Sequence, residues 1–357
     1  MKLRSEDLLR TKGILACSAR LVLPTGQCLP NTQSVATFSL RVPPSRRHLL
    51  PDSSARCIGW SLFLLFAIVL NGGVERSFGD DHERLDVWPN FAPGETSRDT
   101  GLSLPTRPGE SKPIDRVSGV RRPTLDVYPA KNNPSGTGVL ILPGGGFTYV
   151  VPDLEGSEAA AWLNDIGITA FVLRYRTKES AAPGEPLWQR PLQDTQRAVR
   201  LIRKEAERLQ LRPGRIGILG FSAGGQVGAI AHSKGDRSTY DAVDDIDQQA
   251  CRPDFALFIY PWQVLDAKTG ELLEQIQVTD QSAPTFLVHT HDDASSAIGA
   301  AKIYIALKQK NIPAELHIYQ NGGHGYGIRD RPNSVISTWP ARATDWLKVR
   351  GLLDPAP

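Results

Sequence analysis

From about residue 124 to the C-terminus, short apolar runs alternate with longer stretches in which apolar residues recur every three or four positions. Short apolar runs bounded by glycine or proline predict buried strands, and the longer periodicity predicts helices. The expected strands lie near residues 124–128, 138–142, 168–174, 214–220, 254–260, 284–290 and 314–319. The expected helices lie near residues 155–166, 192–210, 223–233, 297–310 and 337–349. This alternation predicts an α/β fold in which a mostly parallel central sheet is covered by helices on both faces.

The N-terminal part differs, because one uncharged apolar run, residues 58–70, follows a stretch without a consistent period. A transmembrane helix needs about 20 residues, whereas this shorter run is typical of the apolar core of a signal peptide. Ser77 and Gly79 supply small residues before a cleavage site at Asp80. We therefore expect residues 1–79 to be an N-terminal extension that directs export to the periplasm or the outside. There are two alternatives for the apolar run. It could be a buried helix, or an uncleaved anchor that tethers the protein to a membrane. After cleavage no stable membrane partner is expected.

The chain has 357 residues, and composition divides the part after the N-terminal extension into two segments. Residues 80–115 are rich in proline, glycine, serine and charge, which is typical of a linker, and residues 116–357 form the predicted catalytic domain. The net charge is only +3, and nine basic residues lie within residues 1–57. The predicted domain is therefore near neutral, which argues against nucleic acid as a partner. Only Cys251 lies beyond the proposed cleavage site, so a disulfide framework is not expected in the mature chain.

A candidate nucleophile stands between an expected strand and an expected helix. Residues Gly220–Gly224 read G-x-S-x-G, with Ser222 at the centre. A nucleophilic serine needs a sharp strand-to-helix turn, and small flanking residues let the backbone make it. The N-terminus of the following helix favours developing negative charge. The context therefore predicts that Ser222 is a catalytic nucleophile rather than an idle serine in a glycine-rich turn.

A glycine-rich loop, Pro143–Phe147, follows the expected strand 138–142. Residues without side chains let backbone N–H groups turn inward toward an oxyanion. We expect one donor to be the amide of Gly145 or Gly146 and the other the amide of Ala223.

The remaining members of a serine triad are expected downstream, in the order acid and then base. Two adjacent aspartates, Asp292 and Asp293, follow the strand near 284–290. We prefer Asp293 as the acid and keep Asp292 as the alternative. His324 lies among glycines after the last strand, where it can reach across the top of the sheet as the base. His289 and His291 before the aspartates could also form a metal pair, but a strand end that leads to the triad acid explains them better. We expect no metal or organic cofactor.

Together these motifs resemble the α/β-hydrolase esterases, in particular the bifunctional acetylxylan and feruloyl esterase group among the hormone-sensitive-lipase-like enzymes. The resemblance spans roughly residues 115–350. It is carried by residues 142–147, 173–176, 193–198, 217–225, 291–293 and 323–325. The chain departs from the group at Ala294–Ser296, where relatives usually have proline or a β-branched residue soon after the acid. Similar chains are sometimes labelled xylanases.

The resemblance implies a serine carboxylesterase that hydrolyses short acyl esters, acetyl or feruloyl, on a polysaccharide or a small molecule. Alternatives are a peptidase of the prolyl-oligopeptidase type, a glycosidase, which requires two facing carboxylates, and an inactive interaction module. Phe147, Trp188 and Trp262 are candidates for the substrate wall, and the loop-like segments 176–190 and 262–282 could supply it. No long apolar insertion suggests a lipase lid.

Overall fold

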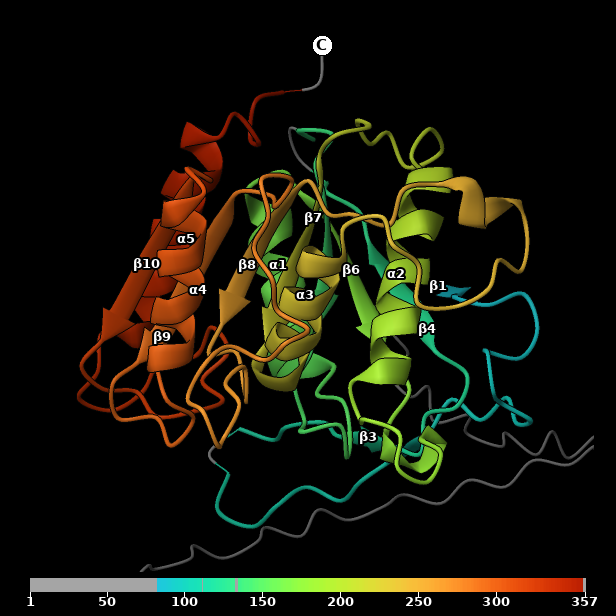
Figure 1. The fold of residues 1–357 in the computed structure, drawn as a ribbon, viewed down its shortest axis with the longest axis horizontal. Coiled ribbons are helices and arrows are strands. Elements are labelled where there is room, and N and C mark those ends of the chain that lie inside the picture. The colour runs from blue at the N-terminus through green and yellow to red at the C-terminus, as the bar shows by residue number, and fades with distance from the viewer. Residues whose placement is uncertain (1–81, 111, 132–133, 356–357) are drawn as a thin grey trace, which may run out of the picture. The chain divides into compact units, whose positions relative to one another are not determined.

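The structure is a computed structural model that describes residues 82–110, 112–131 and 134–355. An eight-stranded sheet forms its centre, in the order β1-β4-β6-β5-β7-β8-β9-β10 (Figure 1). All neighbouring strands are parallel except the pairs β1–β4 and β4–β6. The strands are β1 (Glu83–Asp86), β4 (Thr124–Tyr128), β5 (Gly138–Leu142), β6 (Thr169–Arg174), β7 (Ile216–Phe221), β8 (Phe255–Ile259), β9 (Thr285–Thr290) and β10 (Ala314–Tyr319). A separate small sheet pairs β2 (Leu102–Ser103) with β3 (Val117–Ser118).

Helices cover the sheet on both faces, because the strands alternate apolar side chains toward two separate cores. The five helices among the described residues are α1 (Glu158–Asp165), α2 (Gln189–Lys204), α3 (Ser222–Lys234), α4 (Ile298–Gln309) and α5 (Trp339–Val349). Apolar residues of α2, α3 and α4 pack into one core, and those of α1 and α5 pack into the other. Short turns of helix lie at Asp153–Ser157, Lys178–Ser180, Asp245–Gln248 and Ile336–Thr338. The α/β class and the mostly parallel sheet predicted from the sequence are therefore confirmed.

The expected strands and helices are present, and two helices differ from the prediction in where they begin or end. The helix expected at 155–166 begins as a π-helical turn at Asp153–Ser157 before α1. The helix expected at 192–210 begins earlier, because Pro191 fits the first turn of α2, where its missing N–H is not needed. It ends at Lys204, after which the chain continues as a series of turns.

The prediction of a linker over residues 80–115 is wrong for its first part. Val87, Trp88, Ala92 and Glu95 are buried against the domain, whereas most of the described residues from 96 to 115 are exposed. Strand β1 forms the edge of the main sheet beside β4. Trp88 is 2% exposed, and its indole Nε1 donates to Asp194 on α2 at 2.9 Å. The Arg197 guanidinium, also on α2, donates to the carbonyl oxygen of Val87 at 3.1 Å. The segment is held by these few specific contacts rather than by a periodic apolar face, so composition alone suggested a tether.

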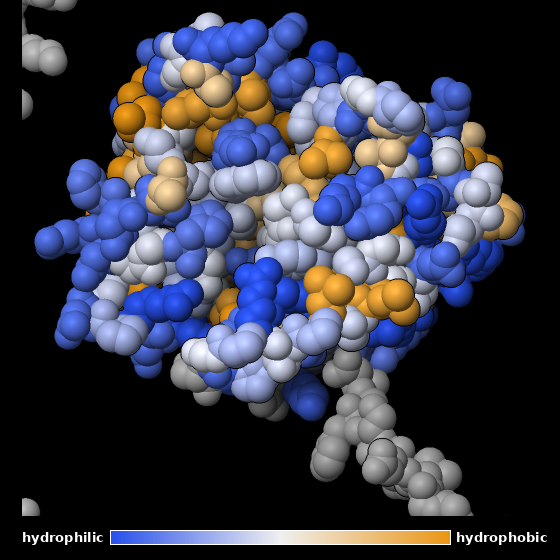
Figure 2. Space-filling view, turned by 90° about the horizontal axis from the view of Figure 1, so that it is seen from below, coloured by the Kyte–Doolittle hydropathy of each residue, from blue (hydrophilic) through white to orange (hydrophobic). Residues whose placement is uncertain are grey.

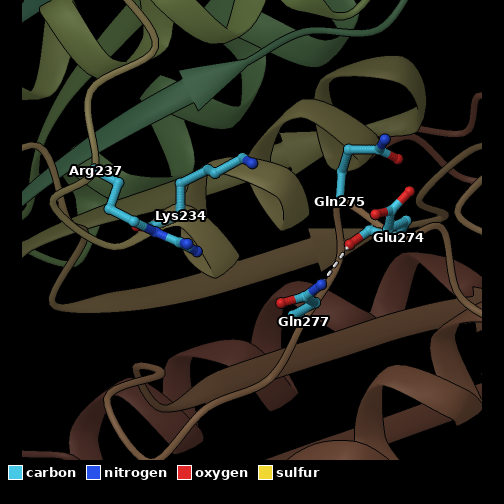
Figure 3. Close-up of a pocket in the computed structure, with 5 residues that line it drawn as sticks. All are labelled: Lys234, Arg237, Glu274, Gln275 and Gln277. Atoms are coloured by element: carbon cyan, nitrogen blue, oxygen red, sulfur yellow. Dashed lines mark hydrogen bonds between the residues drawn. The ribbon is translucent and has the colours of Figure 1, made fainter.

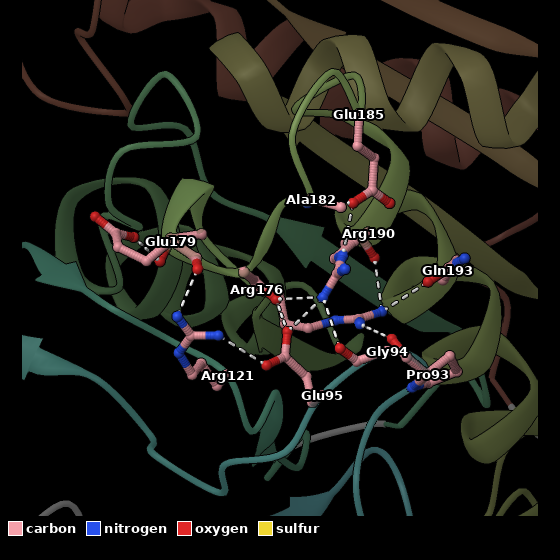
Figure 4. A network of polar contacts seen from close by, with 12 residues as sticks. Pro93, Gly94, Glu95, Arg121, Arg176, Glu179, Ala182, Glu185, Arg190 and Gln193 are labelled. Carbon is pink, nitrogen blue, oxygen red and sulfur yellow. Dashed lines mark hydrogen bonds and ion pairs between the residues drawn. The ribbon is translucent and has the colours of Figure 1, made fainter.

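A network of ion pairs continues this attachment (Figure 4). The buried Arg176 guanidinium donates to the Pro93 carbonyl oxygen at 2.7 Å and pairs with Asp194 at 2.9 Å. Glu95 is bound by Arg121 at 3.0 Å and by Arg190 at 2.8 Å. Segments before β4, after β6 and at the start of α2 are thus fixed to one another.

The expected signal segment, residues 58–70, and the cleavage site before Asp80 lie outside the described residues. Within the part of the chain that the structure describes, no helix has the length and apolar character needed to cross a membrane.

Candidate active site

Ser222 occupies the strained turn that its motif predicts. It is the first residue of α3, directly after β7, and its φ is 51°, an uncommon value for a residue with a side chain. Glycines make room for this turn. A Cβ at Gly224 would lie 2.0 Å from the carbonyl oxygen of Leu142, and one at Gly220 would lie 2.6 Å from that of Gly224. The turn lies beyond the carboxyl end of β7, where α/β sheets bind ligands.

Three side chains predicted from separate parts of the sequence form one chain of hydrogen bonds. The Ser222 Oγ lies 2.7 Å from Nε2 of His324. The His324 Nδ1 lies 2.6 Å from Oδ2 of Asp293. The carboxylate of Asp293 is 1% exposed, whereas the imidazole of His324 is 34% exposed. The tautomer that satisfies both bonds carries its proton on Nδ1 and leaves Nε2 free to accept the serine proton.

The two neighbouring aspartates have different partners. Asp293 also accepts a hydrogen bond from the Ser295 amide at 2.7 Å. Asp292 is exposed and accepts hydrogen bonds from the amides of Gly322 at 3.2 Å and Gly323 at 2.9 Å. The bond from Gly323 is the main cause that lowers the pKa of Asp292 below its ordinary value. The structure therefore places Asp293 in the hydrogen-bond chain and Asp292 beneath the loop that carries His324.

The glycine-rich loop lies beside Ser222 with an unusual backbone. The φ values are 127° at Gly145, 59° at Gly146 and 61° at Phe147. A Cβ at Gly145 would lie 1.9 Å from the Tyr149 carbonyl oxygen, so only glycine fits there. Within the part of the chain that the structure describes, the amides of Gly145 and Gly146 donate to no protein acceptor. The Ala223 amide lies in the first turn of α3, where a helix offers no acceptor of its own.

A cavity of about 490 Å³ opens in front of Ser222 and His324. Its wall includes Arg107, Ile114 and Arg116, and the first two belong to the segment expected as a linker. The guanidinium carbons of Arg107 and Arg116 lie 5.6 and 5.9 Å from the ring centre of Tyr149. The other lining residues are Gly145, Gly146, Thr148, Tyr149, Val151, Leu154, Glu155, Trp262 and Gly325. The cavity thus combines the predicted loops with a wall that the sequence did not indicate.

The three candidate wall residues have different places. Trp262 lines the cavity, and its amide donates to the Ser222 carbonyl oxygen at 3.0 Å. Phe147 is buried behind it, with ring centres 6.3 Å apart, and is not itself a lining residue. Trp188 packs partly buried against the core under α2 and does not line this cavity, which corrects that expectation. Accordingly, segment 262–282 contributes to the wall and segment 176–190 does not.

Sequence reasoning missed Glu155, Tyr175 and Tyr260, three buried residues around the site. Glu155 lines the cavity and accepts a hydrogen bond from the Gly144 amide at 2.7 Å. Tyr260 lies against His324, with ring centres 4.9 Å apart. No motif marks Glu155 or Tyr260. Tyr175 lies within the family-like residues 173–176, but its contact with Pro143, like those of the other two, forms only in the tertiary fold.

Another cavity, of about 180 Å³, lies at the opposite end of α3 (Figure 3). Lys234 and Arg237 face Glu274, Gln275 and Gln277 across it. Its lining side chains include no serine, histidine or cysteine that could form a nucleophile and base pair. Basic residues near the C-terminus of α3 interact favourably with the helix dipole, which explains their presence without a ligand. The cavity therefore adds nothing to the candidate site.

Comparison with known proteins confirms the resemblance indicated by the motifs. The BD-FAE family model matches residues 125–257. The chain is 27% identical over 251 residues to an acetylxylan esterase of Xylanibacter ruminicola, an alignment that covers 61% of this chain and 48% of that protein. It is 31% identical over 241 residues to endo-1,4-beta-xylanase B of Butyrivibrio fibrisolvens, covering 61% of this chain and 36% of that protein. The chain thus spans about half or less of the length of these relatives.

Solved structures show the same fold. An acetyl ester-xyloside bifunctional hydrolase from Caldicellulosiruptor lactoaceticus is 28% identical, with a TM-score of 0.59 over 76% of this chain and 97% of that chain. A thermophilic esterase from Thermogutta terrifontis, at 16% identity, has a TM-score of 0.55 over 72% of this chain and 94% of that chain. The fold of the described domain is that of an α/β hydrolase.

Proposed function

We propose that the protein is a serine carboxylesterase that removes short acyl groups, acetyl foremost, from polysaccharide. The observation that carries this proposal is the chain of two hydrogen bonds from Ser222 through His324 to Asp293 at the mouth of an open cavity. Glycine-loop amides that have no acceptor among the described residues lie at the same cavity. A nucleophile, a base with its orienting acid, and oxyanion donors are the parts that acyl transfer requires.

The geometry supports the following sequence of steps. Nε2 of His324 accepts the Ser222 proton as Oγ bonds to the ester carbonyl carbon, and the carbonyl oxygen becomes an oxyanion. Amides of the Gly145–Gly146 stretch and of Ala223 donate hydrogen bonds to it. His324 then gives the proton to the departing alkoxide, leaving an acyl-enzyme on Ser222. Water repeats the steps with the same base, and the carboxylic acid leaves. Asp293 holds Nδ1–H and stabilises the imidazolium.

The cavity and its surroundings support a short acyl group on a polar carrier. Viewed toward the carboxyl ends of the strands, the surface is largely hydrophilic, with hydrophobic residues in separate patches (Figure 2). A lipase that binds long acyl chains needs a broad apolar face instead. A polar surface around a cavity that Tyr149 lines suits a sugar chain. The relative from Xylanibacter ruminicola is an acetylxylan esterase, and acetylated xylan is therefore our first candidate substrate.

A glycosidase is the alternative that the names of two relatives raise. Hydrolysis of a glycosidic bond ordinarily needs two carboxyl groups that face each other across the sugar. Glu155 is the one acidic residue among the residues that line the cavity, and one of its oxygens is bound to the Gly144 amide. The site therefore favours ester hydrolysis over glycoside hydrolysis.

The product profile on xylan tests the proposal. The protein, incubated with acetylated xylan, is expected to release free acetate while the polymer keeps its length. Methyl ferulate, added separately, tests the feruloyl specificity that the family resemblance suggests. Unsubstituted xylan is the control substrate. Xylo-oligosaccharides released from it would overturn the esterase proposal in favour of the glycosidase.

We also propose that the protein is exported, since an acylated polysaccharide is too large to import. The support is the apolar run at residues 58–70 with small residues before Asp80. Sequencing the N-terminus of the mature protein from its native host tests this. A mature protein that retains residues 58–70 would speak for an anchor instead.

A further inference from the structure

The peptide bond between Pro143 and Gly144 is held from both sides by buried side chains. The Tyr175 hydroxyl donates to the Pro143 carbonyl oxygen at 2.6 Å. The Gly144 amide donates to Oε2 of Glu155 at 2.7 Å. Tyr175 follows β6, whereas Glu155 lies in the π-helical turn before α1. Two unrelated elements therefore fix one peptide plane at the start of the glycine-rich loop.

Glu155 also connects this loop to the loop of the base. Its Oε1 accepts a hydrogen bond from the Tyr260 hydroxyl at 2.7 Å. The same hydroxyl accepts one from the Gly327 amide at 2.9 Å. Gly327 follows His324 closely in sequence, and the Tyr260 ring packs against that imidazole. One carboxylate thus joins the glycine-rich loop, through Tyr260, to the segment that carries the base.

A buried carboxyl group is a costly way to fill the space that Glu155 occupies. Glu155 is 4% exposed, and in the described part of the chain no lysine or arginine forms an ion pair with it. Burial raises the pKa of Glu155, and the hydrogen bonds from Tyr260 and Gly144 oppose this effect. Burial raises the pKa of Tyr175 and of Tyr260 too, so both hydroxyls stay protonated as donors. A buried carboxylate is costly unless hydrogen bonds compensate, and an apolar side chain would fill the same space at lower cost.

The position of Gly144 shows how closely Glu155 adjoins the nucleophile. A Cβ at Gly144 would lie 2.6 Å from Oε2 of Glu155 and 2.8 Å from Cβ of Ser222. The next residues, Gly145 and Gly146, have no side chains that could anchor the loop themselves. If the Pro143–Gly144 peptide turned over, the glycine amides after it would leave their present orientation. The local turn supplies a hydrogen bond from the Thr148 amide to the Gly145 carbonyl oxygen at 3.1 Å, and the contacts of Glu155 and Tyr175 hold the peptide that precedes it.

We propose that Glu155 is a positioning residue of the oxyanion loop: with Tyr175 it holds the Pro143–Gly144 peptide so that the following glycine amides point at the developing oxyanion. This proposal rests on the proposed function, because it assigns those amides the oxyanion. Glu155 itself transfers no proton and does not touch the reacting carbonyl. Its contribution is preorganisation, which lowers the free energy of the transition state relative to the bound ester.

The decisive experiment compares Glu155→Leu, Glu155→Gln and Tyr175→Phe with the wild-type protein on p-nitrophenyl acetate. Rates are divided by the concentration of active serine, titrated to completion with a fluorophosphonate. Glu155→Leu is expected to lower kcat about 10- to 100-fold, since small misplacements of catalytic groups have effects of this size, while KM changes little. Glu155→Gln keeps an acceptor for Gly144 and should recover most of the activity. Tyr175→Phe should lower kcat by a smaller factor.

A transition-state analogue separates positioning from general damage. Binding of a trifluoromethyl ketone should weaken in proportion to kcat/KM across the three variants. The double variant Glu155→Leu/Tyr175→Phe should lose less than the product of the single losses, because both residues hold the same peptide. Glu95→Gln is the matched control, because this buried glutamate belongs to the network of Figure 4 rather than to the cavity. It should lower thermal stability without changing kcat per active serine.

The proposal is overturned if Glu155→Leu keeps kcat within about twofold per titrated serine, or if analogue binding stays constant while kcat falls. If that variant does not fold, Glu155→Gln and Tyr175→Phe still supply the comparison with the analogue. A wild-type protein that hydrolyses no ester would refute the proposed function instead. In that case the rate at which Ser222 is labelled by a fluorophosphonate, measured across the same variants, still tests the positioning of the loop.

Discussion

Asp293 and His324 form the shortest contact of the candidate triad, with 2.6 Å between Oδ2 and Nδ1. The carboxylate is buried and has a second partner in the Ser295 amide, so its orientation is fixed. We expect Asp293→Asn to lower kcat about 10⁴-fold, because an amide in this place favours the wrong imidazole tautomer. Steady-state hydrolysis of p-nitrophenyl acetate measures the loss.

Asp292→Asn is the neighbouring control. Asp292 binds the backbone of Gly322 and Gly323, and an asparagine oxygen can accept part of these bonds. The expected loss in kcat is about tenfold or less, the scale of one hydrogen bond. The lowered pKa of Asp292 means that its stabilisation of the loop is present at neutral pH and disappears as the pH falls through that value. The larger loss in Asp292→Asn would make Asp292 the acid.

Ser222→Ala is expected to abolish ester hydrolysis, with a loss on the order of 10⁶ in kcat, the size seen when a triad nucleophile is removed. The variant should fold normally, because the strained φ at this position is imposed by β7 and α3 around it. A fluorophosphonate should label the wild-type protein once per chain and leave the variant unlabelled. Stoichiometric labelling of the variant would assign the nucleophile to another residue.

The sequence predicted the parts of the molecule that depend on local pattern. Strand β10 occupies the expected residues 314–319, because an apolar alternation between turns leaves the chain few other choices. Ser222 and His324 could be found because their motifs stand directly after strands, and parallel strands bring their carboxyl ends together. The pattern alone does not separate Asp293 from Asp292, because the two side chains are identical and only the backbone turn after β9 points them in different directions.

Residues that act through tertiary contacts could not be predicted in this way. Glu155 and Tyr260 are 105 positions apart in the chain, and neither belongs to a recognisable motif. Residues 82–110 have the composition of a linker, because charged pairs and one tryptophan hold them rather than an apolar stripe. Composition reports how polar a segment is, whereas its burial depends on partners far away in the sequence.

The contacts of residues 82–110 predict different outcomes for two N-terminal truncations. A protein that starts at Asp80 should fold and keep full activity, since residues 1–79 do not fit the α/β pattern. One that starts at Arg116 should fail, because it lacks β1 and exposes the Asp194 carboxylate that Trp88 and Arg176 bind. Circular dichroism and thermal unfolding compare the two.

A single substitution also tests whether residues 82–110 stabilise the domain, and it leaves the chain at full length. Trp88→Ala should lower the free energy of unfolding by about 3–5 kcal/mol, as for other buried aromatic side chains. It should leave kcat nearly unchanged, because Trp88 does not line the cavity. A soluble, fully active protein starting at Arg116 would show that residues 82–115 are dispensable after all.

Trp262 is expected to limit the length of the acyl group. Its side chain lines both the catalytic cavity and a neighbouring cavity of about 400 Å³, which is distinct from the one at the end of α3. Val264, Leu265 and Ala294–Ser296 also line this neighbouring cavity. Trp262→Ala should join the two cavities and admit longer acyl chains. Each methylene group that becomes buried contributes about 0.8 kcal/mol, or roughly fourfold in binding. The ratio of kcat/KM for p-nitrophenyl butyrate over acetate should therefore rise about tenfold.

Trp188→Ala provides the matched comparison, because this second tryptophan is also partly buried but lies outside the cavity. It should leave the butyrate to acetate ratio unchanged, even if the protein loses stability. An unchanged ratio in Trp262→Ala would mean that the acyl group does not extend toward Trp262, and that the tryptophan faces the sugar instead. In that outcome Trp262→Ala should raise KM for acetylated xylan while KM for p-nitrophenyl acetate stays constant, so the two substrates together assign the acyl and sugar sides of the cavity.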